Sequence, residues 1–559
     1  MRRAAYITRV AIFLGGACSV FAQAPFLYSR AAYNAASFMP AGVPSGAIAR
    51  GAIFSVFGTH LGPATPVTAN TYPLGTTLGG ISMNVVQGST VVAVIPIYVS
   101  PNQINAIMPS NAPVGTASLQ VVNGAKSNMT PIRVAANAFG IFTALGTGAG
   151  PGILQNYITA ANQPVNAPVV PAQPGQVITL WGTGLGAVPS DTVAPTAGNL
   201  PTKTEVFVGG VSAPVAYSGR TPCCAGTDQI VFTVPQNAPQ GCWVPVYVRL
   251  GGATVSNVVT MAIASPGSQC TTDIFPRFTA AALNGTVAGV AGVTRVVTHE
   301  DLGVTAPVDV SADYATYFAY SDTTYGQRFP FHPVLSFVPS GTCTAYTLAG
   351  DMLAGDPLPG LIPNTTLLDF GPPLSLTGPK GTRSLAFNQQ SPWPISFLGG
   401  AISNNILNST LFLDPGAYTV QSSGGAGIGG FSANFTLPPP PTWTGRDQLL
   451  AVDRTKPLNI SWTGGDAGQI VFIVGISEDL PSNSSAGFGC IAPAGATTFT
   501  VPTDMLANLP ASRANPLRSK QVIYLLNVPG ASMQKINASG IGDGLTGAFQ
   551  INGKTVAFQ

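Results

Sequence analysis

Two stretches of the chain, 124 residues apart at their starts, carry the same order of glycines, strand-forming residues and turn residues. The segment 51–62 reads GAIFSVFGTHLG, and the segment 175–186 reads GQVITLWGTGLG. The matches continue downstream in the same order, with small drifts in offset, in the pairs Gln103-Ile104 and Gln229-Ile230, Asn111-Ala112-Pro113 and Asn237-Ala238-Pro239, and Ser127-Asn128 and Ser256-Asn257. This internal repeat constrains the fold most, because both copies must form the same kind of unit.

Each copy consists of short runs of β-branched and aromatic residues separated by Gly, Pro and Asn, which is typical of antiparallel β-sandwiches. The expected strands include 53–57, 118–122, 177–181, 230–234 and 244–249. A copy has the size of one immunoglobulin-like domain, about 100 residues. We therefore predict two similar sandwiches, over residues 25–137 and 138–265, in which Phe57 and Trp181 occupy equivalent strand positions.

The rest of the chain is also turn-rich and poor in charge. The whole sequence has 65 glycines and 50 prolines, and only 8% of its 559 residues are charged. This composition excludes coiled coils and helix-rich enzymes, which need far more Glu, Lys and Arg, and it excludes disorder, which needs high charge. The predicted fold class is all-β, with the tandem immunoglobulin-like sandwiches followed by two further β-rich domains, 271–437 and 442–559. The proline run 438–441 is predicted to be a stiff linker between them, and residues 503–509 are the one candidate helix.

Several motifs of the repeat resemble a known domain type. The Gly-Thr-x-Leu-Gly segments at 58–62 and 182–186 and the Ser-Asn pairs before the last strands resemble IPT/TIG-type immunoglobulin-like domains. Over residues 40–265 the chain is similar to an uncharacterised domain family of exported acidobacterial proteins, of which YVSPNQIN at 98–105 and FGIFT at 139–143 are typical. The resemblance implies an exported immunoglobulin-like protein and no catalytic residues. The second copy departs from the first by seven extra residues between Tyr217 and Gln229, where Cys223 and Cys224 lie.

The first 24 residues have the layout of a secretory signal peptide. Arg2, Arg3 and Arg9 form the basic start, residues 10–17 the apolar core, and residues 20–24 a small-residue cleavage region. We expect a mature chain that starts near residue 23, 24 or 25, with a lipid on Cys18 as the minor alternative. Removing three of the 23 basic residues leaves as many basic as acidic side chains, of which there are 20. Nucleic-acid binding, which needs a basic surface, is excluded, and no stretch of the mature chain is apolar enough for a transmembrane helix.

Six cysteines follow the signal segment, and an even number in an exported chain predicts disulfides. Cys242 opens one strand, and Cys270 follows the antiparallel strand that returns beside it. Strand direction therefore favours a Cys242–Cys270 disulfide. Cys223 and Cys224 would then bond each other or other partners, and the pairing of Cys343 with Cys490 stays open. The sequence has no C-x-x-C pair, so the cysteine spacing does not suggest a zinc site.

Catalytic and cofactor motifs are missing from the sequence. The three histidines, His60, His299 and His332, lie outside any H-E-x-x-H pattern, and there is no G-x-S-x-G. The run GAGIGG at 425–430 precedes a strand instead of the helix that a dinucleotide site needs. Residues 1–190 contain no Asp or Glu, so the first repeat has no acidic calcium cage. We predict no cofactor.

The densest group of acids lies in the third domain. Glu300, Asp301, Asp309 and Asp313 are candidates for a metal site, and Tyr317 and Tyr325 are candidates for ligand binding. The plainer interpretation is preferred: the alternation of residues 314, 316, 318 and 320 places aromatic rings on a core face, and the acids lie in solvated loops.

Two functions from different classes fit these observations. The preferred one is a non-catalytic exported protein whose sandwiches form a rod for adhesion, polymer or carbohydrate binding, or envelope structure, with a protein or polysaccharide ligand at the cell surface. The alternative is an extracellular hydrolase with its active site in residues 271–437 and the repeats as accessory domains. Acids and histidines gathered around one pocket would favour the hydrolase.

Overall fold

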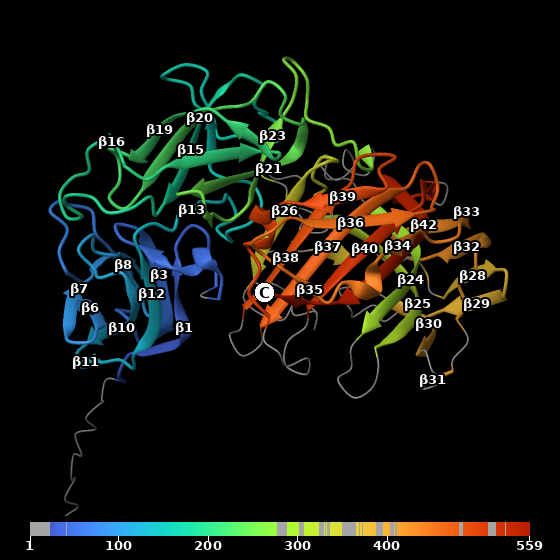
Figure 1. Ribbon diagram of the computed structural model, residues 1–559, viewed down its shortest axis with the longest axis horizontal. Coiled ribbons are helices and arrows are strands. Elements are labelled where there is room, and N and C mark those ends of the chain that lie inside the picture. Colours follow the sequence, from blue (N-terminus) through green and yellow to red (C-terminus); the bar gives the residue numbers. More distant parts are fainter. Residues whose placement is uncertain are drawn as a thin grey trace, which may run out of the picture.

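The chain is built almost entirely from β-strands. The computed structural model describes residues 23–40, 42–276, 288–300, 307–322, 329, 331, 336–348, 365–367, 369, 371, 373–386, 395–402, 407–408, 411–479, 484–512, 521–530 and 533–559. Within them the helical segments are single turns: η1 (Pro44–Gly46), η3 (Arg446–Gln448) and α2 (Thr503–Leu506). Figure 1 shows the repeats on one side and a large curved sheet on the other. The all-β prediction is confirmed, and α2 lies within the candidate helix.

The first repeat is a β-sandwich of two antiparallel sheets that enclose an apolar core. One sheet has the order β1 (Phe26–Asn34), β3 (Ile53–Thr59), β9 (Gln103–Ile107), β8 (Ile95–Val99) and β4 (Val67–Thr68). The other has the order β2 (Ile48–Ala49), β12 (Thr130–Ala135), β10 (Gly115–Asn123), β6 (Ile81–Gln87) and β5 (Thr77–Leu78), with β7 (Thr90–Ala93) and β11 (Ala125–Lys126) beside it. β2 joins this sheet in parallel, and every other pair is antiparallel. Alternate residues of β6 and β10 point into the core, as the two-residue strand period requires.

The second repeat has the same arrangement. One sheet has the order β13 (Gly140–Ile141), β15 (Val177–Thr183), β20 (Asp228–Thr233), β19 (Val215–Arg220) and β16 (Gly198–Asn199), with β14 (Leu154–Asn156) beside β15. The other has the order β18 (Val211–Ala213), β17 (Thr204–Val208), β21 (Gly241–Leu250) and β22 (Thr254–Val255), with β23 (Val259–Ile263) beside β21. Phe57 of β3 lies opposite Gln103, and Trp181 of β15 lies opposite Gln229. Phe57 and Trp181 thus occupy equivalent positions, as the repeat predicts.

The extra residues of the second copy connect the two sandwiches. They form the junction loop, residues 221–227, between β19 and β20. Ala225 packs against the apolar cluster of repeat 1 that contains Leu74 and Ile107. Gly226 lies so close to repeat 1 that a Cβ atom on it would stand 2.6 Å from Cγ1 of Ile53. Asn34 adds hydrogen bonds from its side-chain amide to backbone carbonyls of repeat 2. The two repeats therefore form one packed body.

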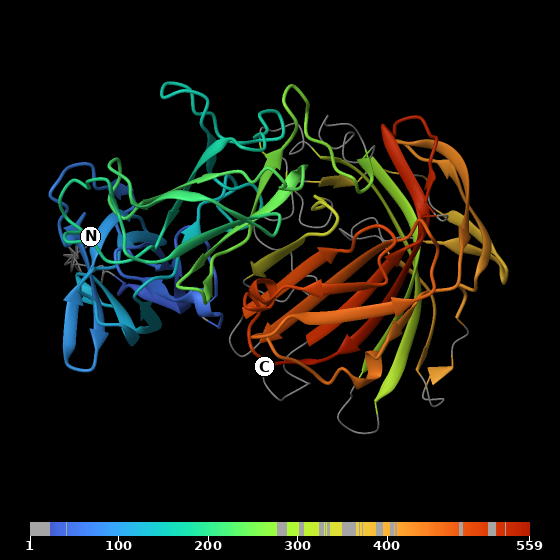
Figure 2. The same ribbon diagram turned by 45° about the horizontal axis from the view of Figure 1, so that its top comes forward.

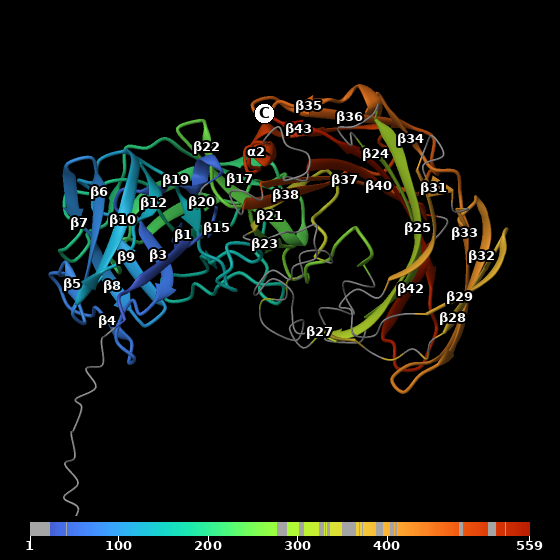
Figure 3. The ribbon, with the colours of Figure 1, turned by 90° about the horizontal axis from the view of Figure 1, so that it is seen from below.

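One large sheet spans the C-terminal half. Its order is β26 (Cys343–Leu348), β38 (Ser484–Ile491), β37 (Ile470–Asp479), β40 (Gln521–Val528), β42 (Asp543–Thr555), β24 (Ala288–Glu300), β25 (Val308–Asp322), β30 (Ile395–Ile402) and β31 (Leu407–Asn408), with β27 (Thr365–Leu367) and β41 (Gln534–Lys535) beside it. At its centre β24 and β42 run parallel, in continuous register from Ala288–Asp543 to His299–Lys554. Figure 3 shows how strongly this sheet curves.

Two smaller sheets pack against the large one. The first has the order β29 (Gly381–Leu385), β28 (Leu374–Gly378), β32 (Gly416–Gly424) and β33 (Gly429–Leu437), and shares a core with Ala291, Val293 and Ala548 of the large sheet. The second has the order β34 (Thr442–Thr444), β36 (Leu458–Thr463) and β39 (Thr498–Val501). Trp443 and Trp462 of that sheet pack with Ile473 and Phe488. A short parallel pair, β35 (Ala451–Val452) and β43 (Ala557–Phe558), accompanies them.

The proline run 438–441 does not separate two domains, and this part of the sequence prediction is wrong. Gln550 donates a hydrogen bond to the carbonyl of Pro438 at 2.7 Å, and Asn552 donates one to the carbonyl of Pro441 at 3.2 Å. Prolines have no N–H to donate, but their carbonyls still accept, so side chains of β42 hold the run against the sheet. Residues on both sides of the run belong to the same sheet through the β24–β42 pairing.

Repeat 2 also packs directly on the C-terminal half, so the sandwiches do not form an extended rod. The rings of Phe207 and Tyr247 stack at 5.0 Å between centroids, and the Arg249 guanidinium lies 4.6 Å from the centroid of Phe207. Tyr247 donates to the carboxylate of Asp504 at 3.0 Å, and Tyr247 shares an apolar core with Trp462. Figure 2 shows this side-by-side arrangement.

Three disulfides join the six cysteines of residues 223–490. Cys242 is bonded to Cys270, with Cα atoms 5.1 Å apart, next to the antiparallel pair β21–β23. Cys343 and Cys490 face each other in β26 and β38 and are bonded. The adjacent Cys223 and Cys224 are bonded to each other in the junction loop.

The signal segment, residues 1–24, lies outside the described residues except for its last two. No helix within the described part of the chain has the length and apolar character needed to cross a bilayer.

Cleavage within the proline run tests the shared C-terminal sheet. We expect that a chain cut by a protease at a site inserted in residues 438–441 keeps its two halves together on size-exclusion chromatography, because β24 and β42 pair over their length. The Cys343–Cys490 disulfide also links the two halves across the cut, so the experiment uses the C343A/C490A variant, which lacks this bond. In that variant denaturant should separate the halves. Halves that elute separately in native buffer would contradict the shared sheet.

Substitution of Gly226 tests the contact between the repeats. Gly226 and Gly252 both have positive φ, of 75° and 77°, but only Gly226 lies against another sandwich, whereas a Cβ on Gly252 meets nothing within 4 Å. G252A should cost about 1–2 kcal/mol, from the left-handed backbone alone. G226A should cost about 1–3 kcal/mol more through overpacking against Ile53. Urea denaturation of both variants measures the difference, and equal midpoints would refute the contact.

Candidate functional site

Two acids of residues 271–437, Asp313 and Asp309, form structural ion pairs. Asp313 in β25 is fully buried, and both its carboxylate oxygens bind the Arg295 guanidinium, at 2.7 and 2.8 Å. The backbone N–H groups of Phe412 and Leu413 donate to the same carboxylate at 2.6 and 2.8 Å. These donors occupy the oxygens that a calcium ion would need. Asp313 therefore anchors residues 412–413 to the large sheet.

The positions of Asp313 and Tyr314 correct the sequence prediction for this part of β25, whereas the side chains of Phe318 and Tyr320 lie outside the described residues. Asp313 and Ala315 point into the buried core, and Tyr314 points to the other face, where its ring meets Phe397 at 5.8 Å. The acids were expected in solvated loops and the aromatic rings in the core. A carboxylate can occupy a buried position here because Arg295 and two N–H groups satisfy it.

Asp309 belongs to a second ion-pair network at the start of β25. Its carboxylate binds Nδ1 of His299 at 2.9 Å and the Arg446 guanidinium at 2.9 Å. Arg446 also binds Asp447 at 2.7 Å, and this hydrogen bond lowers the pKa of the Asp447 carboxyl. The hydroxyl of Thr555 donates to the backbone carbonyl of His299 and not to its ring. The network joins β24, β25 and η3 by charge.

The remaining predicted residues are placed as follows. Glu300 ends β24 and is half-buried, and burial raises the pKa of its carboxyl. Tyr317 lies in β25 opposite Ala291. Asp301, Tyr325 and His332 lie outside the described residues. His60 is exposed at the end of β3, remote from the ion-pair networks. Among the described residues, no group of three or more His, Cys, Asp or Glu side chains is arranged to hold a metal ion.

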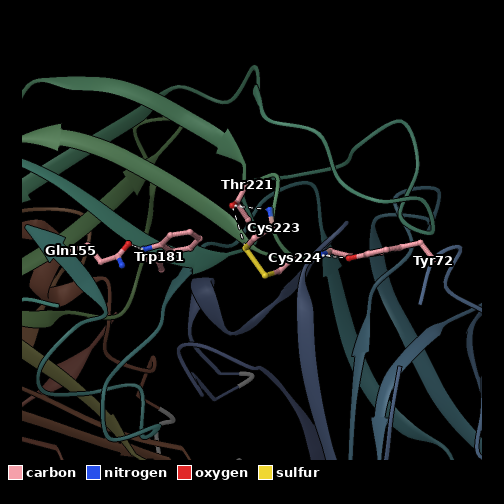
Figure 4. The surroundings of a disulfide bond; sticks show 7 residues. Tyr72, Gln155, Trp181, Thr221, Cys223 and Cys224 are labelled. Atoms are coloured by element: carbon pink, nitrogen blue, oxygen red, sulfur yellow. Dashed lines mark hydrogen bonds between the residues drawn. A yellow bond between two sulfur atoms is a disulfide. The ribbon is translucent and has the colours of Figure 1, made fainter. Parts of the chain in front are cut away.

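The junction between the repeats brings together a different set of side chains. We call Tyr72, Gln155, Trp181, Cys223 and Cys224 the junction patch. Figure 4 shows them in a row, with the exposed Cys223–Cys224 disulfide between the indole and the phenol. Gln155, Trp181 and the two cysteines come from repeat 2, whereas Tyr72 comes from the loop between β4 and β5 of repeat 1. The patch thus exists only when both sandwiches are docked.

Hydrogen bonds fix the orientation of both rings. The indole N–H of Trp181 donates to Oε1 of Gln155 at 2.7 Å. The hydroxyl of Tyr72 accepts from the backbone N–H of Ala225 in the junction loop at 3.2 Å. Tyr72 has 43% of its surface exposed, and Trp181 is partly exposed on the outer face of β15. Preoriented rings lose little conformational entropy when a ligand binds.

The stretch of sequence that contains Trp181 carries almost no charge. From residue 134 to residue 202 the chain has a single Asp, Glu, Lys or Arg side chain, Asp191. That carboxylate accepts from the backbone N–H of Ser110 at 2.7 Å and from its hydroxyl at 2.8 Å. Gln229 lies directly opposite Trp181 on β20, so the groups beside the ring are neutral amides.

A buried ion pair closes the base of the junction loop. Arg220 and Asp228 face each other at the ends of β19 and β20, with 3.0 Å between Nη1 and Oδ1. Asp228 also accepts from the N–H groups of Gly184 and Leu185, both at 2.8 Å. Arg220 donates to the carbonyl of Gly51 in repeat 1 at 3.2 Å. The Gly-Thr-x-Leu-Gly segment of repeat 2 is therefore held by the same pair that holds the loop.

Comparison with known proteins identifies no family for the chain. No protein-family model matches it, and no curated protein matches it. Among solved structures, a Bacteroides ovatus protein of a mixed-linkage glucan utilization locus, in complex with a mixed-linkage heptasaccharide, is 13% identical; the match covers 83% of this chain and 89% of that one, with a TM-score of 0.14. The titin I-band fragment I67-I69 is 8% identical over 69% of this chain and 94% of that one, with a TM-score of 0.10. The BSP domain of a biofilm associated protein is 9% identical over 90% of this chain and 92% of that one, with a TM-score of 0.12.

Sequence reasoning did not find the junction patch. Trp181 was singled out only as a repeat position, and Cys223 and Cys224 only as disulfide candidates. The long uncharged stretch around Trp181 was the signal that could have indicated a neutral binding surface. Tyr72 gave no such signal, because its place beside the disulfide depends on how the two sandwiches dock.

Substitution of Asp313 tests its structural role. D313A leaves the Arg295 guanidinium unpaired beside the core and two N–H groups without an acceptor, so it should cost about 3–5 kcal/mol of unfolding free energy. D309A removes an ion pair from a more exposed network and should cost no more than about 1 kcal/mol. Urea denaturation of the two variants provides the measurement. A cost for D313A as small as that for D309A would show that the buried pair does not anchor residues 412–413.

Proposed function

We propose that this chain is a non-catalytic exported protein that binds an uncharged polysaccharide at the cell surface, and that the junction patch forms part of its binding surface. The observation that carries the proposal is the oriented, partly exposed indole of Trp181 beside neutral amides in a region almost free of charge.

The chemistry of a neutral sugar fits this surface. A pyranose ring has an apolar face of C–H groups, which packs on an aromatic ring, and hydroxyls, which need neutral donors and acceptors. Trp181 supplies the ring, and Gln155 and Gln229 supply amides on the neighbouring strands. The disulfide and Tyr72 extend the surface across the junction, as a polymer ligand requires. The charged pair near Trp181, Arg220 and Asp228, is buried and paired within the fold, so we do not expect it to select an anionic or cationic polymer.

The disulfides support an exported location. All six cysteines after the signal segment are paired, and such bonds persist in oxidising compartments outside the cytoplasm. The signal segment at residues 1–24 is part of the same proposal. Among the described acids of residues 271–437, Asp309, Asp313 and Asp414 form ion pairs, and Asp273 and Asp369 accept hydrogen bonds from backbone N–H groups. We therefore prefer the non-catalytic function to the hydrolase alternative.

Affinity electrophoresis tests the ligand class. We expect the full exported chain to be retarded in gels that contain a neutral polysaccharide such as a β-glucan or xylan, and not in gels that contain alginate. W181A should weaken retardation roughly tenfold, equivalent to about 1.4 kcal/mol, because it removes the ring on which a sugar would pack.

Y28A is the matched control, since Tyr28 is an aromatic residue of repeat 1 with 47% of its surface exposed, outside the patch. It should bind as the unmodified chain does. Retardation by alginate alone, or equal binding by W181A and the unmodified chain, would contradict the proposal.

A further inference from the structure

The Cys223–Cys224 disulfide differs from the other two disulfides in exposure. Both cysteines are exposed at the tip of the junction loop. Cys242, Cys270, Cys343 and Cys490 have 8% or less of their surface exposed. A thiol can therefore approach the Cys223 and Cys224 sulfurs without unfolding, whereas it can reach the others only after the surrounding core opens.

This disulfide also contributes differently to stability. Cys242–Cys270 and Cys343–Cys490 close loops of 28 and 147 residues, and such bridges stabilise a fold by restricting the unfolded chain. Cys223–Cys224 joins neighbours in sequence, so it closes no chain loop and restricts only the backbone of the loop tip. Ala225, the next residue, donates its N–H to Tyr72 of repeat 1. The bond therefore acts on the junction and not on global stability.

The two sulfurs have different surroundings. The buried hydroxyl of Thr221 donates a hydrogen bond to Sγ of Cys223 at 3.5 Å. A donor at this position stabilises negative charge on Cys223 when the disulfide opens, which makes Cys223 the better leaving group. Attack at the Cys224 sulfur follows as the favoured direction.

We propose that Cys223–Cys224 is a thiol–disulfide exchange site that accepts two electrons from a dithiol reductant. A thiolate of the reductant attacks Sγ of Cys224 and forms a mixed disulfide, while the electron pair of the S–S bond passes to Cys223, which leaves as a thiolate beside Thr221. The second thiol of the reductant then attacks its own sulfur in the mixed disulfide and releases Cys224. The reductant leaves as a cyclic disulfide, and the two protons that its thiols gave up end on Cys223 and Cys224. In the reverse direction, the reduced pair Cys223 and Cys224 gives its two electrons to the disulfide of a partner, so that the partner leaves as a dithiol and the Cys223–Cys224 bond forms again.

Graded reduction of the native full chain tests the selectivity. The protein is treated with increasing dithiothreitol, the free thiols are alkylated with iodoacetamide, and peptides are mapped by mass spectrometry. We expect Cys223 and Cys224 to be labelled at least tenfold faster than the other four cysteines, together with faster amide hydrogen exchange at Ala225. Labelling of Cys242, Cys270, Cys343 or Cys490 at the same rate or earlier would overturn the proposal.

Two further measurements test the direction of attack. Glutathione, a monothiol, should be found on Cys224 and not on Cys223. T221V should slow reduction about fivefold, as expected for the loss of one hydrogen bond to the leaving sulfur, and T221S should keep the original rate. T227V is the matched control, because Thr227 lies in the same loop and its N–H bonds the backbone of Cys224. Glutathione on Cys223, or equal rates for T221V and T227V, would overturn the assigned direction.

Discussion

The parallel pairing of β24 with β42 is the interaction on which the C-terminal half depends. It brings residues 288–299 beside residues 543–554, and the hydroxyl of Thr546 reaches the carbonyl of Ala291, 255 residues away in sequence. The four-stranded sheet packs on these two strands, and the proline run lies across one of them. Without this pairing, the large sheet would fall into two parts with edges that are unpaired.

The inter-repeat junction depends on a seven-residue insertion. Its base is held by the buried Arg220–Asp228 pair, and Ala225 of the loop packs on apolar residues of repeat 1. The insertion occurs in repeat 2 only, and its loop contacts repeat 1. The proposed sugar surface and the proposed exchange site both belong to this loop or to its neighbours, so the binding surface and the redox chemistry share one structural element.

Local patterns in the sequence predicted local structure well. Alternating and β-branched runs indicated the strands, the repeat aligned Phe57 with Trp181, and the weak helical pattern at 503–509 contains α2. The partners of distant strands could not be predicted, because a strand such as β24 carries no local mark of pairing with β42. The burial of Asp313 could not be predicted for a similar reason. It depends on Arg295 and on the N–H groups of residues 412–413, almost 100 residues away in sequence. The junction patch escaped prediction because Tyr72 joins it only through docking.

The place of β42 in the large sheet has a consequence for how the chain reaches its folded state. A chain that emerges from its N-terminus can complete both repeats early, since their strands pair within each copy. The central position of the large sheet stays empty until residues 543–555 emerge, because they form the last of its strands in sequence order. Long-range pairing of this kind is slow and leaves strand edges exposed in the meantime. The C-terminal half can therefore close only after residues 543–555 are available, and until then the half-formed sheet is the part of the molecule most in need of protection against aggregation.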